Sequence, residues 1–287
     1  MKIAHISDPH FFVPNYSLSQ FLSKRWLGNL NLLLNRKSEL FIERLCLLPL
    51  FFKSKGVTDV VISGDLTTTS SDAEFEKAQH FVQQFENEGI RVTLIPGNHD
   101  NYTRAAGRGK TFYKYFPSTY KNPKSAHPNL RDDRHTVLPL ENNWTMVLVD
   151  TSVPTPLHLS TGNFSNTLEQ ALTSTLTLLE GKNVILVNHY PFISIEKKQR
   201  RLVGAENLFN LLKKFPCVRM YWHGHTHRKI IADLRESKLP VVLDPGSISY
   251  KQGSFFISDL TQDQIDLKSY HWRKSHWIVE KQANFTW

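Results

Sequence analysis

The sequence contains few cysteines and no long apolar run. Of its 287 residues only Cys46 and Cys217 are cysteines, so no disulfide framework can be predicted and a reducing compartment is expected. No stretch approaches the roughly 18 apolar residues that span a bilayer. Met1 leads directly into a short strand-like segment, unlike a secretory signal. These absences predict a cytoplasmic protein without a membrane span.

Acidic residues are outnumbered by basic ones. The chain has 35 Lys+Arg against 26 Asp+Glu, a formal net charge of +9. This excess favours an anionic partner such as a phosphate ester, a nucleic acid or an acidic membrane surface. The length is sufficient for a large core, and we expect one domain over residues 1–287.

Five strand-like segments each end in residue types that bind metals. In the clearest case the run from Arg91 to Ile95 stops at Pro96-Gly97 and is followed by Asn98, His99 and Asp100. The same design recurs at Asp8-Pro9-His10, Gly64-Asp65, Asn188-His189 and Gly224-His225-Thr226-His227. Ligands of open α/β sheets bind at the carboxyl ends of strands, so we expect these endings to meet. His225 and His227 alternate in what reads as an extended segment, which predicts that both rings face the same side.

Strands and helices alternate between these endings. We expect strands at 2–7, 57–63, 91–95, 144–149, 184–187, 217–222, 241–243, 255–258 and 264–270, and helices at 18–34, 39–55, 168–179 and 206–214. A capping box at Ser71 to Glu74 opens a further helix that stops near Gly89, and 101–133 and 150–166 read as loops. The pattern predicts an α/β fold: two mixed β-sheets packed as a sandwich, with helices on both outer faces and a metal site at the C-terminal ends of strands.

The segment near residues 16–36 has two interpretations. Its apolar residues recur at spacings of three and four and are flanked by basic residues, which is typical of an amphipathic helix. One interpretation is a surface helix that packs on the sheet. The other is a lid that binds acyl chains or touches a membrane surface, with Leu22 and Trp26 as substrate contacts.

Basic residues also follow the Asn98–Asp100 motif. Arg104, Arg108 and Lys110 are the nearest. Such a run is either a solvated face or a set of cations that binds a second phosphate or a nucleotide of the substrate.

The candidate ligands are carboxylates, an amide and imidazoles, with no thiolate. This donor set suits Mn²⁺, Fe²⁺ or Zn²⁺, and seven candidates exceed one tetrahedral shell, so two divalent ions are expected. We take Mn²⁺ as the first expectation, with Fe²⁺ or Zn²⁺ as alternatives. Two ions generate a bridging hydroxide and clamp both oxygens of a phosphoryl transfer. Seven other histidines are interpreted as structural: His5, His80, His127, His135, His158, His223 and His271.

In order and spacing, the five endings resemble the motifs of the calcineurin-like metallophosphoesterases. The resemblance implies one metal held by Asp8, His10, Asp65 and His227, and a second held by Asp65, Asn98, His189 and His225, with Asp65 bridging. It also implies that His99 is the acid that protonates the leaving oxygen, and that Asp100 orients His99.

Within this family the chain looks most like the enzymes that hydrolyse UDP-2,3-diacylglucosamine to UMP and 2,3-diacylglucosamine 1-phosphate in lipid A biosynthesis. The apolar segment, its neighbouring cations and the basic composition favour this nucleotide-linked lipid. They imply a peripheral position on the inner face of the bacterial inner membrane and no protein partner.

Other functions remain as alternatives. The motif Gly97-Asn98-His99-Asp100 equally suits a cyclic-nucleotide or other small phosphodiesterase. A non-catalytic scaffold of the same fold is disfavoured because every ligand position is filled. Nucleic-acid hydrolysis fits the charge, but the chain lacks aromatic residues interleaved with a basic stripe.

Overall fold

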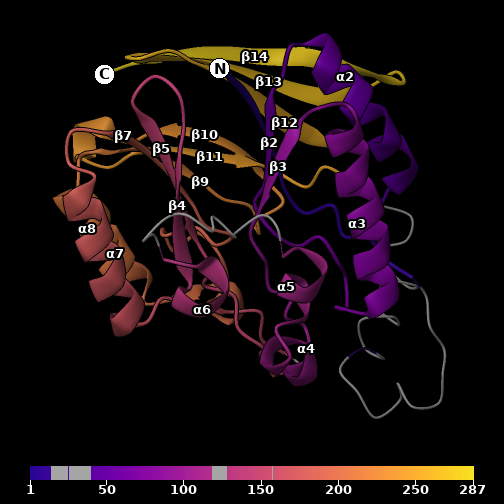
Figure 1. Cartoon of the computed structure of the whole chain (residues 1–287), viewed down its shortest axis with the longest axis horizontal. Coiled ribbons are helices and arrows are strands. Elements are labelled where there is room, and N and C mark those ends of the chain that lie inside the picture. Colours follow the sequence, from indigo (N-terminus) through magenta and orange to yellow (C-terminus); the bar gives the residue numbers. More distant parts are fainter. Residues whose placement is uncertain (14–24, 26–39, 118–127, 157) are drawn as a thin grey trace.

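Two six-stranded β-sheets form the centre of the molecule, with helices on their outer sides (Figure 1). The computed structural model describes residues 1–13, 25, 40–117, 128–156 and 158–287. Each sheet contains both parallel and antiparallel pairs. The predicted α/β fold with two mixed sheets is therefore confirmed.

The first sheet joins strands from both ends of the chain. Its order is β14 (His276–Thr286), β13 (Gln264–Arg273), β12 (Ser254–Leu260), β1 (Lys2–Ile6), β2 (Asp59–Ile62) and β3 (Arg91–Leu94). β1, β2 and β3 run parallel, with Ala4 opposite Val60 and Val60 opposite Val92. Their carboxyl ends therefore lie at one edge of the sheet.

The second sheet has four parallel strands at its centre. Its order is β10 (Lys229–Asp233), β11 (Val241–Pro245), β9 (Val218–Trp222), β7 (Asn183–Val187), β5 (Trp144–Val149) and β4 (His135–Pro139). β11, β9, β7 and β5 are parallel. β5, β7 and β11 are buried along their whole length, as expected for strands covered on both faces. A separate two-stranded sheet joins β6 (Gly162–Asn163) to β8 (Leu202–Val203).

Two pairs of helices cover the sheets (Figure 1). α2 (Leu48–Ser54), preceded by the 3₁₀ helix η3 (Ile42–Leu47), and α3 (Asp72–Asn87) lie on the outside of the first sheet. α7 (Asn166–Leu178) and α8 (Ala205–Lys214) lie outside the second. The capping box predicted for α3 is confirmed, because the Ser71 side chain accepts from the Glu74 N–H and the Glu74 carboxylate accepts from the Ser71 N–H.

Apolar side chains fill the space between the sheets. Ile6 and Ile62 from the first sheet and Trp222 and Leu243 from the second are fully buried there. A second apolar cluster lies beneath α7 and α8. Burial of a large apolar side chain contributes about 1.5–3 kcal/mol, so the two sheets are held firmly against each other and their carboxyl edges keep a fixed relation.

Several elements differ from the sequence prediction. The expected loop at 101–133 contains the short helices α4 (Arg104–Arg108), α5 (Thr111–Tyr115) and α6 (Leu130–Asp133). The helix expected from residue 39 gives way to a bridge between Leu40 and Tyr250, and helical structure starts at Ile42. β4, β10 and β14 were not predicted, and all three are edge strands.

The helix expected at 18–34 and the lid near 16–36, including Leu22 and Trp26, lie outside the described residues, with Arg25 as the exception. His127 also lies outside them. Within the described part of the chain, no helix has the length and apolar character that crossing a bilayer requires.

Candidate metal centre

The five strand endings meet where the carboxyl edges of the two sheets face each other. β1, β2 and β3 lead to the first three endings, and β7 and β9 lead to His189 and to the turn with His225 and His227. The sheets come into contact at this point, since His189 Nε2 lies 3.4 Å from Asp65 Oδ2. Seven predicted ligands from distant parts of the sequence thus form two adjoining clusters that share Asp65.

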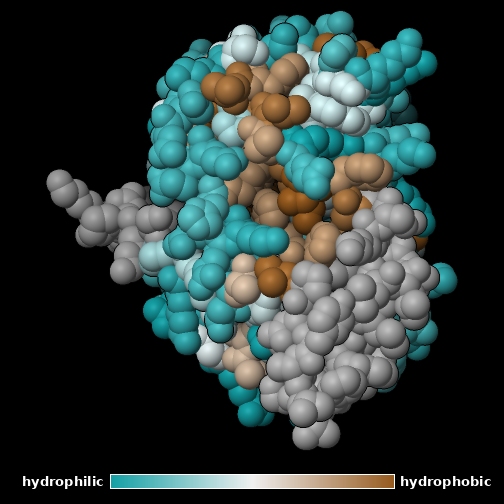
Figure 2. All heavy atoms as spheres, turned by 90° about the vertical axis from the view of Figure 1, so that its right-hand side faces the viewer, coloured by the Kyte–Doolittle hydropathy of each residue, from teal (hydrophilic) through white to brown (hydrophobic). Residues whose placement is uncertain are grey.

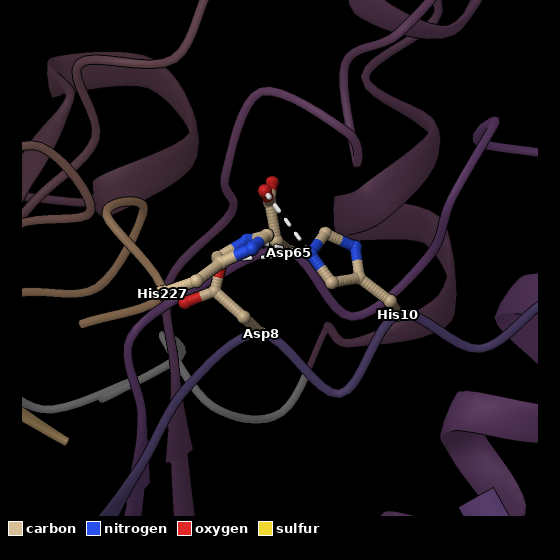
Figure 3. Close-up of side chains that lie close together, drawn as sticks. All are labelled: Asp8, His10, Asp65 and His227. Carbon is tan, nitrogen blue, oxygen red and sulfur yellow. Dashed lines mark hydrogen bonds and ion pairs between the residues drawn. The ribbon is translucent and has the colours of Figure 1, made fainter. Parts of the chain in front are cut away.

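The first cluster consists of Asp8, His10, Asp65 and His227 (Figure 3). The Nε2 atoms of His10 and His227 lie 3.0 Å apart. Asp8 Oδ1 lies 3.1 Å from His227 Nε2 and 3.6 Å from His10 Nε2, and Asp65 Oδ2 lies 4.0 Å from His10 Nε2. These four donor atoms surround one point.

The second cluster consists of Asp65, Asn98, His189 and His225. Asn98 Oδ1 lies 2.9 Å from His225 Nδ1 and 3.3 Å from His189 Nε2. Because Asp65 Oδ2 is near His10 on one side and His189 on the other, Asp65 occupies the position of a bridging ligand. Its other oxygen, Oδ1, accepts a hydrogen bond of 2.7 Å from the His99 N–H.

Backbone carbonyls fix the orientation of three imidazoles. His189 Nδ1 lies 2.8 Å from the Ser63 carbonyl, His225 Nε2 lies 2.8 Å from the Arg200 carbonyl and His10 Nδ1 lies 3.4 Å from the Thr67 carbonyl. A carbonyl can only accept, so each of these nitrogens carries a proton and the other nitrogen faces its cluster, where it could donate a lone pair to a metal ion. This arrangement is typical of metal-binding histidines.

Burial and neighbouring charges set the protonation of the clusters. Burial lowers the pKa of His10 and of His225 well below the usual range, so both are neutral at pH 7. Burial alone would raise the pKa of Asp8, but His227 holds it well below its usual range. His189 has the same effect on Asp65, and Asp65 in turn raises the pKa of His189 to about 9 against the opposing effect of burial. A metal ion therefore displaces a proton when it binds between Asp65 and His189.

The donor set fits two divalent ions. Asp8 Oδ1 is buried and faces the His227 and His10 imidazoles at 3.1 and 3.6 Å, and a carboxylate oxygen in this position suits a bound cation. Oxygen and imidazole donors without sulfur suit Mn²⁺, Fe²⁺ or Zn²⁺. Ions held by these residues would supply Lewis-acid charge and lower the pKa of water for attack on phosphorus.

His99 lies beside the first cluster with its ring oriented by the backbone. Its Nδ1 lies 2.6 Å from the Thr68 carbonyl. The ring meets the edge of His10 at a centroid distance of 4.9 Å and stacks on Tyr102 at 5.5 Å. An imidazole that is protonated on both nitrogens could act here as a general acid through Nε2.

The contacts of Asp100 connect two turns, and its expected role in orienting His99 stays a prediction. Its carboxylate accepts hydrogen bonds from the N–H groups of Leu66, Thr67 and Gly97, at 2.9 to 3.2 Å. Asp100 therefore joins the turn after β2 to the turn after β3. It positions Asp65 and His99 through the backbone, and the Thr68 carbonyl orients the His99 ring.

The prediction that His225 and His227 face the same side is wrong. Both lie in a turn with left-handed backbone, at φ of 69° and 57°, and not in an extended segment. Their rings consequently enter different clusters. Left-handed φ also occurs at Asp8 (54°), His10 (49°) and Asp65 (55°), so five of the candidate ligands sit on sharply turned backbone.

No contact within the described part of the chain joins the basic residues after Asp100 to either cluster. Arg104 and Arg108 are exposed on α4, and Lys110 is paired with Asp132 at 2.6 Å. Their expected contact with substrate stays a prediction.

The sequence analysis did not identify Arg200, which contacts His225 twice. Its guanidinium donates to the His225 carbonyl at 2.9 Å, and its own carbonyl accepts from the His225 ring. The only feature of the sequence that could have pointed to Arg200 is its position in the basic segment 197–201.

A Gly97→Ala substitution is expected to displace the bridging carboxylate. A Cβ at Gly97 would lie 2.2 Å from Asp65 Oδ1 and 2.5 Å from Asp65 N, so Asp65 would have to shift. We expect lower metal content and a loss of about 1–3 kcal/mol in the free energy of unfolding, as for overpacking elsewhere. Metal analysis and denaturant titration measure both. Gly109→Ala, whose nearest contact is at 3.0 Å on exposed α4, is the control, and full metal occupancy in Gly97→Ala would contradict the steric argument.

Comparison with known proteins agrees with the geometry. The Calcineurin-like phosphoesterase family matches residues 1–229. A 3',5'-cyclic-nucleotide phosphodiesterase from Nostoc sp. is 22% identical over 173 residues, which are 59% of this chain and 56% of that relative. The match thus spans little more than half of either protein.

Two solved structures share the fold. A dimetal phosphatase from Danio rerio has a TM-score of 0.69 and 16% identity, over 99% of this chain and 98% of that one. A purple acid phosphatase from yellow lupin (Lupinus luteus) seeds has a TM-score of 0.64 and 11% identity, over 99% of this chain and 53% of that one. The family match over residues 1–229 leads to one conclusion: the chain belongs to the calcineurin-like phosphoesterase family, and its two clusters supply the ligand types that a metal-dependent phosphoester hydrolase needs.

Proposed function

We propose that the enzyme hydrolyses UDP-2,3-diacylglucosamine at the inner face of a bacterial inner membrane. Water attacks one phosphorus of the pyrophosphate, the bridging P–O bond breaks, and UMP and 2,3-diacylglucosamine 1-phosphate are released. His99, held through Nδ1, donates a proton from Nε2 to the leaving oxygen. Mn²⁺ is the proposed metal.

The observation that supports a lipid substrate is the position of Arg25. This residue belongs to the apolar and basic segment of residues 16–36. Its guanidinium donates to the carbonyls of Thr69 at 3.2 Å and Ser70 at 2.7 Å. The same loop supplies the Thr67 and Thr68 carbonyls that face His10 and His99. Arg25 itself is therefore held by the loop that faces the metal centre, and this contact supports the proposal of a lid for acyl chains.

Exposed apolar side chains support contact with a membrane. Phe41, Leu47 and Leu50 are 43%, 48% and 62% exposed, and they follow the apolar segment directly in sequence. Figure 2 shows apolar side chains among polar ones on the face that carries α2 and α3, beside the residues drawn in grey. Lys53, which is paired with Glu88, and Lys55 are exposed at the C-terminal end of α2, and exposed lysines suit anionic head groups.

A cyclic-nucleotide phosphodiesterase is the second candidate. It is favoured by the similarity to the Nostoc enzyme and by the presence of His99 in an unmodified motif. A substrate of this kind is small and has no need of the apolar segment.

Direct comparison of substrates tests the proposal. We expect the Mn²⁺-loaded protein, in detergent, to release UMP and the lipid monophosphate from UDP-2,3-diacylglucosamine far faster than it cleaves cyclic AMP or bis-p-nitrophenyl phosphate. ³¹P NMR or mass spectrometry identifies the products. Turnover of the small diesters alone would leave the metal chemistry in place and refute the lipid substrate.

The double variant Leu22→Ser, Trp26→Ser extends the test. Its rate on the lipid, relative to its rate on bis-p-nitrophenyl phosphate, should fall roughly 10-fold or more for each lost apolar contact. Leu178→Ser, on an 86% exposed position of α7, is the matched control.

A further inference from the structure

A groove opens from the first metal cluster across the end of the first sheet. It has a volume of about 750 Å³, and His227 forms one end of it. The loop between β11 and β12 and the paired strands β13 and β14 form its walls, with Tyr250, Lys251, Trp272 and Arg273 among the lining residues. The groove thus connects a candidate metal ligand with a surface that has no part in the chemistry described above.

The walls combine aromatic surface with positive charge. The Tyr250 ring meets the His227 ring at a centroid distance of 4.8 Å, next to the metal cluster. Trp272 lies further along and is only partly buried. Lys229 and His271 share Glu280 as an ionic partner. Lys251 and Arg273 have no ionic partner within the described part of the chain, so the groove carries a net positive charge. Flat, partly exposed rings beside such cations favour a ligand with a planar ring and a phosphate.

The groove is held in shape by a buried arginine. The Arg44 guanidinium donates to the carbonyls of Ile248, Tyr250 and Lys251 and lies 5.6 Å from the centre of the Trp272 ring. The backbone N–H of Trp272 donates to the carbonyls of Gln252 and Gly253. A preformed wall costs little ordering entropy when a ligand binds.

The same loop is fixed to the metal centre. Ser247 Oγ donates to the Asp8 carbonyl at 2.7 Å, and Ser249 Oγ donates to it at 3.2 Å. The distance from the groove to the first metal cluster is therefore set by direct hydrogen bonds.

We propose that this groove binds the nucleoside monophosphate half of the substrate, with the base on Trp272 and anionic oxygens near Lys251 and Arg273. The inference rests on the proposed function in that it takes the substrate to carry a nucleotide. It specifies which surface recognises that nucleotide and leaves the apolar segment for the rest of the substrate.

Inhibition by UMP tests the groove without the lipid. The assay is hydrolysis of bis-p-nitrophenyl phosphate by the Mn²⁺-loaded protein, in which the inhibition constant of UMP would be determined for each variant against that variant's own turnover. Trp272→Ala should raise the constant roughly 5- to 150-fold, the range for loss of a base–aromatic stack. Lys251→Ala and Arg273→Ala should each raise it roughly 2- to 5-fold, as for exposed ion pairs.

Controls separate stacking and charge from damage to the fold. Trp272→Phe keeps a ring and should retain most of the UMP affinity, whereas Lys281→Ala removes an exposed charge from β14 outside the groove and should change nothing. Equal losses in the Phe and Ala variants, unchanged constants in all groove variants, or inhibition by inorganic phosphate as strong as by UMP would each overturn the inference.

The outcomes also separate this inference from the proposed function. UMP inhibition that depends on Trp272, in a protein that leaves the lipid intact, would support the groove and refute the lipid substrate. Hydrolysis of the lipid with UMP inhibition indifferent to the groove variants would support the lipid and refute the groove.

Discussion

Asp65→Asn is expected to abolish metal binding and turnover together. Asp65 Oδ2 lies between His10 Nε2 and His189 Nε2, at 4.0 and 3.4 Å, and is the only described ligand atom common to both clusters. An amide has nearly the same shape and can still accept the His99 N–H, but it lacks the negative charge that two adjacent cations require. The substitution therefore removes charge from the centre with little change in packing.

Metal analysis after dialysis and hydrolysis of bis-p-nitrophenyl phosphate measure the effect. We expect loss of both ions and activity at the level of buffer, with a circular dichroism spectrum like that of the unmodified protein. Asp263→Asn makes the same chemical change at an exposed position and should retain both ions. Two bound ions per chain in Asp65→Asn would contradict the bridging role.

His99→Gln is expected to lower kcat by roughly 10²- to 10⁴-fold, the usual contribution of a general acid, while both metal ions remain bound. The His99 ring contacts the edge of His10 but belongs to neither cluster. Glutamine can still donate a hydrogen bond to the leaving oxygen, but it cannot transfer a proton. The loss should therefore depend on the leaving group: it should be smallest for p-nitrophenolate, which departs without protonation, and largest for an alkyl or sugar phosphate oxygen.

Rates for diesters with leaving groups of graded pKa measure this dependence. His80→Gln, at an exposed position on α3, is the matched control. An unchanged rate for poor leaving groups would refute the role of His99 as an acid. An equal decrease in kcat for all leaving groups, together with loss of metal, would instead indicate that His99 has a structural role in the metal cluster.

The central part of the fold could be predicted because its strands are buried. β2 and β7 are apolar runs covered on both faces, and polar ligand types that follow such runs are conspicuous in the sequence. Parallel strands of one sheet bring their carboxyl ends to one edge, so the proximity of Asp8, Asp65 and Asn98 followed from the pattern, whereas His189 comes from the second sheet. The capping box at Ser71 was predictable for a similar reason, because its hydrogen bonds are local.

The edge strands β4, β10 and β14 could not be predicted in this way, whereas the edge strand β3 was predicted at 91–95. β14 is largely exposed and includes the polar run Glu280–Gln282, and β10 is partly exposed throughout. Edge strands are often polar, which protects them from pairing with other chains, and this polarity removes the alternation by which strands are recognised. Their pairing is specified by neighbouring strands rather than by their own sequences.

The finer geometry of the site depends on backbone atoms. The backbone carbonyls of Ser63, Thr68 and Arg200 orient the rings of His189, His99 and His225, respectively. Every residue has a carbonyl, so the residue types do not reveal which carbonyls make these contacts. The spacing of His225 and His227 was misleading because the chain turns between them. Asp100 could be identified as important, but its partners are N–H groups that only the folded turns bring together.

The left-handed backbone at the ligands has a consequence for how this protein can evolve. Asp8, His10, Asp65, His225 and His227 all have positive φ, and residues held in this region cost about 1–3 kcal/mol each. Selection for resistance to heat alone would favour glycine at these positions, which adopts such φ values without a steric penalty. A descendant of this chain that no longer needed to hold metal would therefore become more stable as it lost its ligands. Within a lineage, glycine at these five positions would be an early mark of an abandoned activity.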